Sequence, residues 1–105
     1  MAIFTVHQLD RDLPEKSRDD YFRLSFRTEF YQPEDFGKFF NPVARVDANN
    51  MEHVFELTNR WHDLDRVRRY MPMHSLSVGD ILECHTGEHE YYIVADYGFD
   101  KIEVA

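Results

Sequence analysis

The sequence is poor in cysteine, glycine and proline, and it contains no long apolar run. Its single cysteine, Cys84, excludes an internal disulfide framework. The four glycines are scattered singly, which leaves no place for a glycine-rich phosphate loop. No apolar stretch approaches the roughly 20 residues that cross a bilayer, and the N-terminal residues lack the basic and apolar regions of a secretory signal. These absences predict a protein of a reducing, cytoplasmic compartment.

Basic residues are also in the minority, because 20 acids stand against 12 lysines and arginines and leave a net charge of −8. From Ser75 onward there are seven acids against Lys101 alone, a net charge of −6, whereas residues 1–74 carry only −2. Such an acidic segment repels nucleic-acid phosphates and favours a partner protein with a basic surface. Alternatively, the acids only keep a sheet edge soluble. The candidate partner-binding residues are Asp80, Glu83, Glu88, Glu90, Asp96, Asp100 and Glu103.

The length of 105 residues, 43% of them hydrophobic, predicts a single domain over residues 1–105. Ala2–Leu9 alternates loosely between apolar and polar residues, as a strand does, and Val43–Ala48 is a second brief strand. From Met51 the apolar residues recur at spacings of three and four, which predicts a helix over about residues 50–61 with Asn49 or Asn50 as its N-cap. The order favours an α+β fold, a small antiparallel sheet that could be strongly curled, with this one main helix packed on it.

The strongest alternation lies at Tyr21–Tyr31, where Phe22, Leu24, Phe26 and Phe30 fall on one side and charged or polar residues on the other. This period of two over about ten residues predicts a strand with one buried face. We expect the main helix to pack on the sheet that carries this strand.

The last third, Ser75–Val104, predicts a three-stranded antiparallel meander. Its turns are expected at the three glycines Gly79, Gly87 and Gly98, with Gly79 in a conformation of positive φ.

The tightest cluster of possible metal ligands is Cys84, His85 and His89, with Glu88 and Glu90 beside them. Cys84 and His85 point to opposite faces of one strand, and the spacing of a structural zinc site is missing. We therefore expect no metal and no cofactor. Cys84 with a nearby histidine supplies only the residue types of a nucleophile and a base, so we expect no enzyme and no catalytic residues.

One locally basic and aromatic stretch precedes the meander. It is either a second contact patch for an acidic surface or phosphates, or a solvated helix end whose arginines pair with Asp63 and Asp65. The candidate residues are Arg60, Trp61, Arg66, Arg68 and Arg69.

The segments LSVGDILE and GEHEYYIVADYGFDKIEV carry three features: Ser77–Asp80 leading into a strand, the pair Tyr91–Tyr92, and a Gly98–Phe99 turn. Over about residues 43–104 the chain thereby resembles the YodL-like domain of bacterial mobile-element and phage proteins. Ala95–Tyr97 departs from the Asp-Ser-aromatic pattern expected there. The resemblance implies a biological context, the cytoplasm of a bacterial host, and carries no catalytic residue over to this chain.

Charge and resemblance together predict a non-enzymatic phage or mobile-element accessory protein that binds a host protein with a basic surface. An acidic inhibitor of a nucleic-acid-handling or defence system, such as restriction or CRISPR, is one such protein. We expect no membrane partner, and an exposed strand edge leaves a homodimer open. One alternative is a small-ligand or nucleotide-binding module lined by Tyr91, Tyr92, Trp61 or Tyr97. The other is a small metal-dependent hydrolase.

Overall fold

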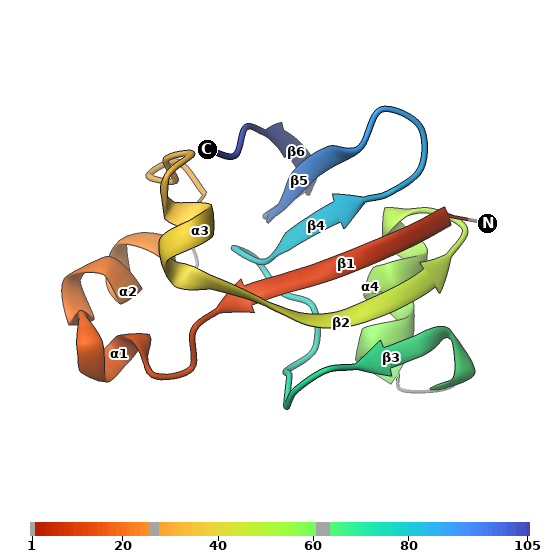
Figure 1. Ribbon diagram of the computed structural model, residues 1–105, viewed down its shortest axis with the longest axis horizontal. Helices are drawn as coiled ribbons and strands as arrows, with labels where there is room; N and C mark the ends of the chain where they lie inside the picture. Colours follow the sequence, from red (N-terminus) through yellow and green to blue (C-terminus); the bar gives the residue numbers. More distant parts are fainter. Residues whose placement is uncertain (1, 26–27, 61–63) are drawn as a thin grey trace.

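A computed structural model describes residues 2–25, 28–60 and 64–105 of the chain. All its strands join one antiparallel sheet in the order β3-β2-β1-β4-β5-β6 (Figure 1). β3 and β6 form the two edges, so the sheet is open rather than closed on itself. The strands are β1 (Ala2–Leu9), β2 (Phe40–Ala48), β3 (Val67–Arg69), β4 (Ile81–Cys84), β5 (Glu90–Ala95) and β6 (Gly98–Ile102).

Helices lie at both ends of this sheet. In Figure 1, α1, α2 and α3 gather near the end where β1 finishes, while α4 lies behind the other end. The expected α+β class is confirmed, but the described residues form four short α-helices instead of one main helix. None of the described helices is long and apolar enough to cross a membrane. Their bounds are α1 (Leu13–Lys16), α2 (Arg18–Leu24), α3 (Asp35–Phe39) and α4 (Met51–Arg60), and a 3₁₀ turn, η1, covers Leu64–Arg66.

The main hydrophobic core lies between the sheet and α4. Successive side chains of a strand point to opposite faces, and on this face β1 contributes Phe4 and Val6. α4 contributes Val54 and Leu57, which are three residues apart and therefore share one side of the helix. The helix begins as predicted, because Asn50 Oδ1 accepts a hydrogen bond from the backbone N–H of His53 at 2.8 Å. Burial on this face fixes the register of the sheet.

A second apolar cluster covers part of the opposite face. Ile81 and Ile93 point away from α4 and pack with Leu24 from α2 and Phe40 from β2. Phe36 and other aromatic residues of α3 and the preceding loop close this cluster from outside. α2 and α3 therefore cover only one end of this face, and polar side chains occupy the end that they leave open.

The strand predicted over Tyr21–Tyr31 is wrong, because its first part is the end of α2 and its last part is a turn. Leu24 is buried at 2% exposure, but Phe22 is 64% exposed, so the alternation does not mark a buried face. Phe26 lies outside the described residues. Ser17 is the N-cap of a helix instead, because its backbone carbonyl accepts a hydrogen bond from the N–H of Tyr21 at 3.0 Å.

A buried ion pair ties this helix to α3. Arg23 donates two hydrogen bonds to the carboxylate of Asp35, at 2.8 and 3.0 Å, and a third to the carbonyl of Phe30 at 3.0 Å. Burial raises the pKa of Asp35, but the bonds from Arg23 and from the backbone of Gln32 outweigh it and hold that pKa below its ordinary value. The pair joins α2 to α3, while Leu24 and Phe36 pack these helices on the sheet.

We expect Arg23→Ala to lower the free energy of unfolding by about 2–3 kcal/mol, because the buried carboxylate of Asp35 would then lose its cationic partner and keep only the backbone N–H of Gln32. Urea denaturation measures the change. Arg18→Ala, an exposed arginine in the same helix, is the matched control and should stay within about 0.5 kcal/mol of the parent chain. Equal stability of the two variants would show that the pair does not anchor α2.

Candidate functional site

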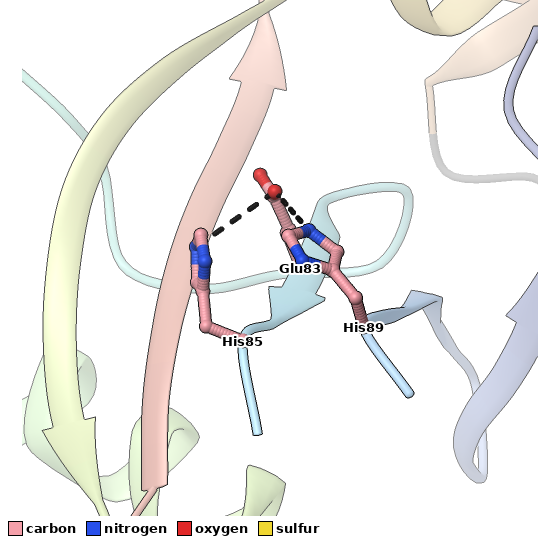
Figure 2. A group of neighbouring side chains, drawn as sticks. All are labelled: Glu83, His85 and His89. Carbon is pink, nitrogen blue, oxygen red and sulfur yellow. Dashed lines mark hydrogen bonds and ion pairs between the residues drawn. The ribbon is translucent and has the colours of Figure 1, made fainter. Parts of the chain in front are cut away.

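Three side chains with metal-binding atoms converge on the open part of the sheet. Glu83 lies in β4, His85 just after it, and His89 just before β5 (Figure 2). Their nearest nitrogen and oxygen atoms all lie within 4.8 Å of one another. Glu83 Oε2 accepts a hydrogen bond from His89 Nε2 at 2.6 Å and lies 3.8 Å from His85 Nε2. The two imidazole rings meet nearly edge to face, with centroids 4.9 Å apart. We call these three residues the Glu83 cluster.

The register of the sheet explains why the cluster forms. Thr5 of β1, Glu83 of β4 and Tyr91 of β5 are direct cross-strand neighbours, so their side chains share one face. His85 is two residues after Glu83, which keeps it on this face. His89 precedes β5 at a φ of 60°, and its Nε2 lies 2.6 Å from Glu83 Oε2. The turn between them contains Gly87 at φ 71°. A hairpin therefore delivers all three ligands.

A buried histidine fixes the other oxygen of Glu83. His7 Nε2–H donates to Glu83 Oε1 at 2.8 Å, because a carboxylate can only accept. Burial lowers the pKa of His7 more than Glu83 raises it, so this imidazole is neutral near pH 7. Burial raises the pKa of Glu83, but the hydrogen bonds from His7 and His89 bring it below its ordinary value. Glu83 is therefore an ionised carboxylate with only 15% of its side chain exposed.

Apolar and hydroxyl groups surround the cluster. Phe36 of α3 packs on His7 and on Tyr91, with ring centroids 4.7 and 5.3 Å apart respectively. Thr5 Oγ1 lies 2.8 Å from His85 Nε2. The site is closed on the side of α3 and open to solvent beside the two histidines.

The Glu83 cluster differs in one residue from the cluster considered in the sequence, where Cys84 stood in place of Glu83 and no metal was expected. Cys84 does point away from His85, as the sequence indicated, and its thiol donates to the carbonyl of Thr86 at 3.7 Å. Sequence reasoning placed Glu83 among the partner-binding acids and missed its role in this cluster. The spacing Glu83-x-His85 was the available signal, because residues two apart in a strand share a face.

Asp80 is not part of an exposed acidic surface, which corrects the prediction for this residue. It is 4% exposed, and its Oδ2 accepts hydrogen bonds from Gln8 Nε2 and from the backbone N–H of Ser77, both at 3.0 Å. Burial raises the pKa of Asp80 to about 6, although nearby His74 and these two bonds act in the opposite direction. The residue stabilises the turn at Gly79, which has the expected positive φ of 96°.

Of the other predicted acids, Glu88 lies in the turn between β4 and β5, and the rest lie on or beside the β5–β6 hairpin. Glu90 is partly buried and pairs with Lys101 of β6 across the hairpin. The exposed acids of this group, which we call the hairpin acids, are Glu88, Asp96, Asp100 and Glu103.

The predicted arginine patch is divided by the sheet. Arg68 lies opposite Arg45 of β2 and shares a face with it, whereas Arg69 lies opposite Ala44 and points to the face of α4. Arg66 belongs to η1. Trp61 and the side chain of Arg60 lie outside the described residues. The arginines therefore follow one edge of the sheet without forming a patch on one face.

The three tyrosines predicted to line a ligand pocket do not share one face of the sheet. Tyr91 and Tyr92 are consecutive in β5 and point to opposite faces. Tyr97 is fully exposed, at 100%, in the turn between β5 and β6. The nucleotide-binding alternative therefore stays a prediction, because Trp61 lies outside the described residues.

Comparisons of the chain with protein-family models, curated proteins and solved structures give no significant match. Its function must therefore be argued from its own residues.

The buried carboxyl of Asp80 predicts a stability that falls as pH rises. The folded state holds this proton up to about pH 6, whereas the ordinary pKa is 3.8, so ionisation between these values disfavours the folded state. We expect Asp80→Asn, which keeps an oxygen acceptor, to be more stable than the parent by about 2 kcal/mol at pH 8. The advantage should shrink toward zero near pH 4.

Thermal melts at several pH values measure this difference. Asp100→Asn, an exposed acid of the hairpin, is the matched control and should show no pH-dependent gain. An Asp80→Asn chain that is less stable than the parent at pH 8 would show that the ionised carboxylate stabilises the turn.

Proposed function

We propose that the chain is a non-enzymatic accessory protein of a phage or mobile element that binds a basic surface of a host protein through its β5–β6 hairpin. A host protein that handles nucleic acid has such a surface, because it receives phosphates there. An acidic hairpin that occupies this surface inhibits the host protein, and restriction and CRISPR systems are natural targets.

The observation that carries this proposal is the coincidence of charge and a free sheet edge. β6 is the last strand of the sheet and pairs only with β5 among the described strands. Residues 86–105 hold five acids against Lys101 alone, a net charge of −4. Edge strands carry backbone groups that can pair with another chain, and concentrated charge of one sign speeds encounter with a complementary surface.

Tyr97 supports the same surface. It lies at the tip of the hairpin beside Asp96, and its side chain is fully exposed. Tyrosine is enriched at the centres of protein interfaces because it offers a large rigid contact area with a polar end. A tyrosine amid acids suits a basic surface that also offers an apolar or cationic contact for the ring.

The opposite edge of the sheet differs in charge. Arg68 and Arg69 lie in β3, five positions away from β6 in the order of strands. The negative charge is therefore concentrated away from β3, and this asymmetry would orient the chain on a basic partner with β6 inward.

The proposal predicts a salt-sensitive complex that depends on the hairpin acids. Capture from a bacterial lysate at about 50 mM and about 500 mM salt compares weak and strong screening. The test variant combines Glu88→Gln, Asp96→Asn, Asp100→Asn and Glu103→Gln. We expect a partner bound at low salt to be lost at high salt and with this variant, and duplex DNA to compete for the same partner.

A matched control removes four negative charges elsewhere. Asp12→Asn, Glu15→Gln, Asp19→Asn and Glu52→Gln change exposed acids outside the β5–β6 hairpin and should leave capture intact. Equal losses with both quadruple variants would reduce the effect to net charge and contradict a hairpin interface.

Tyr97→Ala tests the contact at the hairpin tip. We expect the affinity for the captured partner to fall at least about tenfold, because truncating an aromatic anchor typically costs at least about 1–2 kcal/mol. The melting temperature should stay unchanged, since the side chain is fully exposed. Tyr70→Ala, an exposed tyrosine near the β3 edge, is the control, and unchanged binding by both variants would remove Tyr97 from the interface.

A further inference from the structure

We propose that Glu83, His85 and His89 form a binding site for a divalent transition metal ion of the zinc class. The proposal goes beyond partner binding and rests on different atoms. Two imidazoles and one carboxylate are a donor set found in three-ligand zinc sites. Nitrogen donors favour zinc, cobalt, nickel or copper, whereas magnesium and calcium prefer oxygen ligands alone.

The distances fit a tetrahedral ion after small side-chain movements. Bonds of about 2.1 Å at tetrahedral angles place neighbouring ligand atoms about 3.4 Å apart. Glu83 Oε2 lies 2.6 Å from His89 Nε2 and 3.8 Å from His85 Nε2, values on either side of that spacing. As all three ligand atoms lie within 4.8 Å of one another, changes of about an ångström complete the geometry. Figure 2 shows both rings directed toward the carboxylate.

The surroundings orient the carboxylate for this role. His7 holds Oε1 at 2.8 Å, which leaves Oε2 facing the two histidines. Outer partners of this kind fix the direction of a ligand and raise metal affinity. Phe36 packs on His7 and limits solvent on one side of the site. The carboxylate is therefore already ionised and already oriented before an ion arrives.

Two contacts must be exchanged when the ion binds. Nε2 of His89, which now bonds Glu83, carries no proton when it coordinates, so the neutral ring takes the tautomer with its proton on Nδ1. His85 Nε2 gives up its 2.8 Å contact with Thr5 Oγ1. Three protein ligands then leave the fourth coordination position of the ion to water on the solvent side.

The experiment titrates the chain, free of any histidine tag and without a partner, with zinc chloride in a calorimeter. Cobalt(II) in a parallel titration reports coordination geometry by its visible absorption. We expect one zinc per chain and an intense cobalt spectrum typical of four-coordination, with no comparable binding of magnesium or calcium. Absence of stoichiometric zinc, or equal binding of magnesium, would overturn the site.

Variants assign the ligands. His85→Ala and His89→Ala change exposed residues, so the fold should persist, and each should weaken zinc binding at least about tenfold. Glu83→Gln should have a similar effect, with its folding checked by circular dichroism because this residue is partly buried. His74→Ala removes an exposed histidine outside the cluster and should leave zinc affinity unchanged. A loss with His74→Ala equal to that with His89→Ala would reduce the binding to nonspecific surface histidines and refute the proposal.

Since no host protein takes part in this experiment, a failure to bind zinc leaves the proposed hairpin interface untouched, and a failure to capture a partner leaves the proposed metal site untouched.

Discussion

The pairing of β1 with both β2 and β4 is the constraint on which the rest of the structure depends. This central strand alternates between two environments, with Phe4 and Val6 against α4 and Thr5 and His7 against the opposite face. The register shifts between Val6 and His7, where Val43 of β2 has no partner in β1; Val6 is buried on the face of α4 and His7 under Phe36 on the other face. A one-residue slip of β4 against β1 would send Glu83 into the apolar core, at the cost of burying an unpaired charge. Core packing and the Glu83 cluster are therefore two results of one register.

Sequence periodicity predicted the elements whose own residues repeat a regular apolar pattern or end at turn glycines. β1, α4 and the strands of the C-terminal meander follow from alternation, from spacing at three and four, and from turn glycines such as Gly79 and Gly98. It failed at Tyr21–Tyr31, because an aromatic residue at every second position can also arise where a short helix runs into a turn. Ser17, Asp19 and Asp20 were the local signals of a helix start. The pairing of Arg23 with Asp35 joins two residues that lie 12 positions apart in different helices, and alternation within one segment carries no information about such a contact.

The candidate site was only partly visible in the sequence for a similar reason. The two histidines were identified. Cys84 was grouped with them because it is adjacent to His85 in the sequence, although adjacent residues of a strand point to opposite faces. Glu83 belongs to the cluster because it is two residues before His85 and therefore shares its face. His7, 76 residues away in the sequence, bonds Glu83 because β1 pairs with β4. Among the acids, composition alone could not separate the buried Asp80 from the exposed Asp96. Burial decides which of the seven acids can meet a partner.

The two proposals rest on electrostatic interactions of different range, and ionic strength separates them. The hairpin acids are exposed, so their attraction for a basic partner acts over a Debye length of about 10 Å at 0.1 M salt and weakens as salt rises. Coordination at the Glu83 cluster acts through bonds of about 2 Å beside a carboxylate that His7 and Phe36 partly shield. Salt screens such short, partly desolvated contacts much less than it screens exposed charges. If zinc stays bound at a salt concentration that releases the partner, the two activities belong to two distinct sets of atoms.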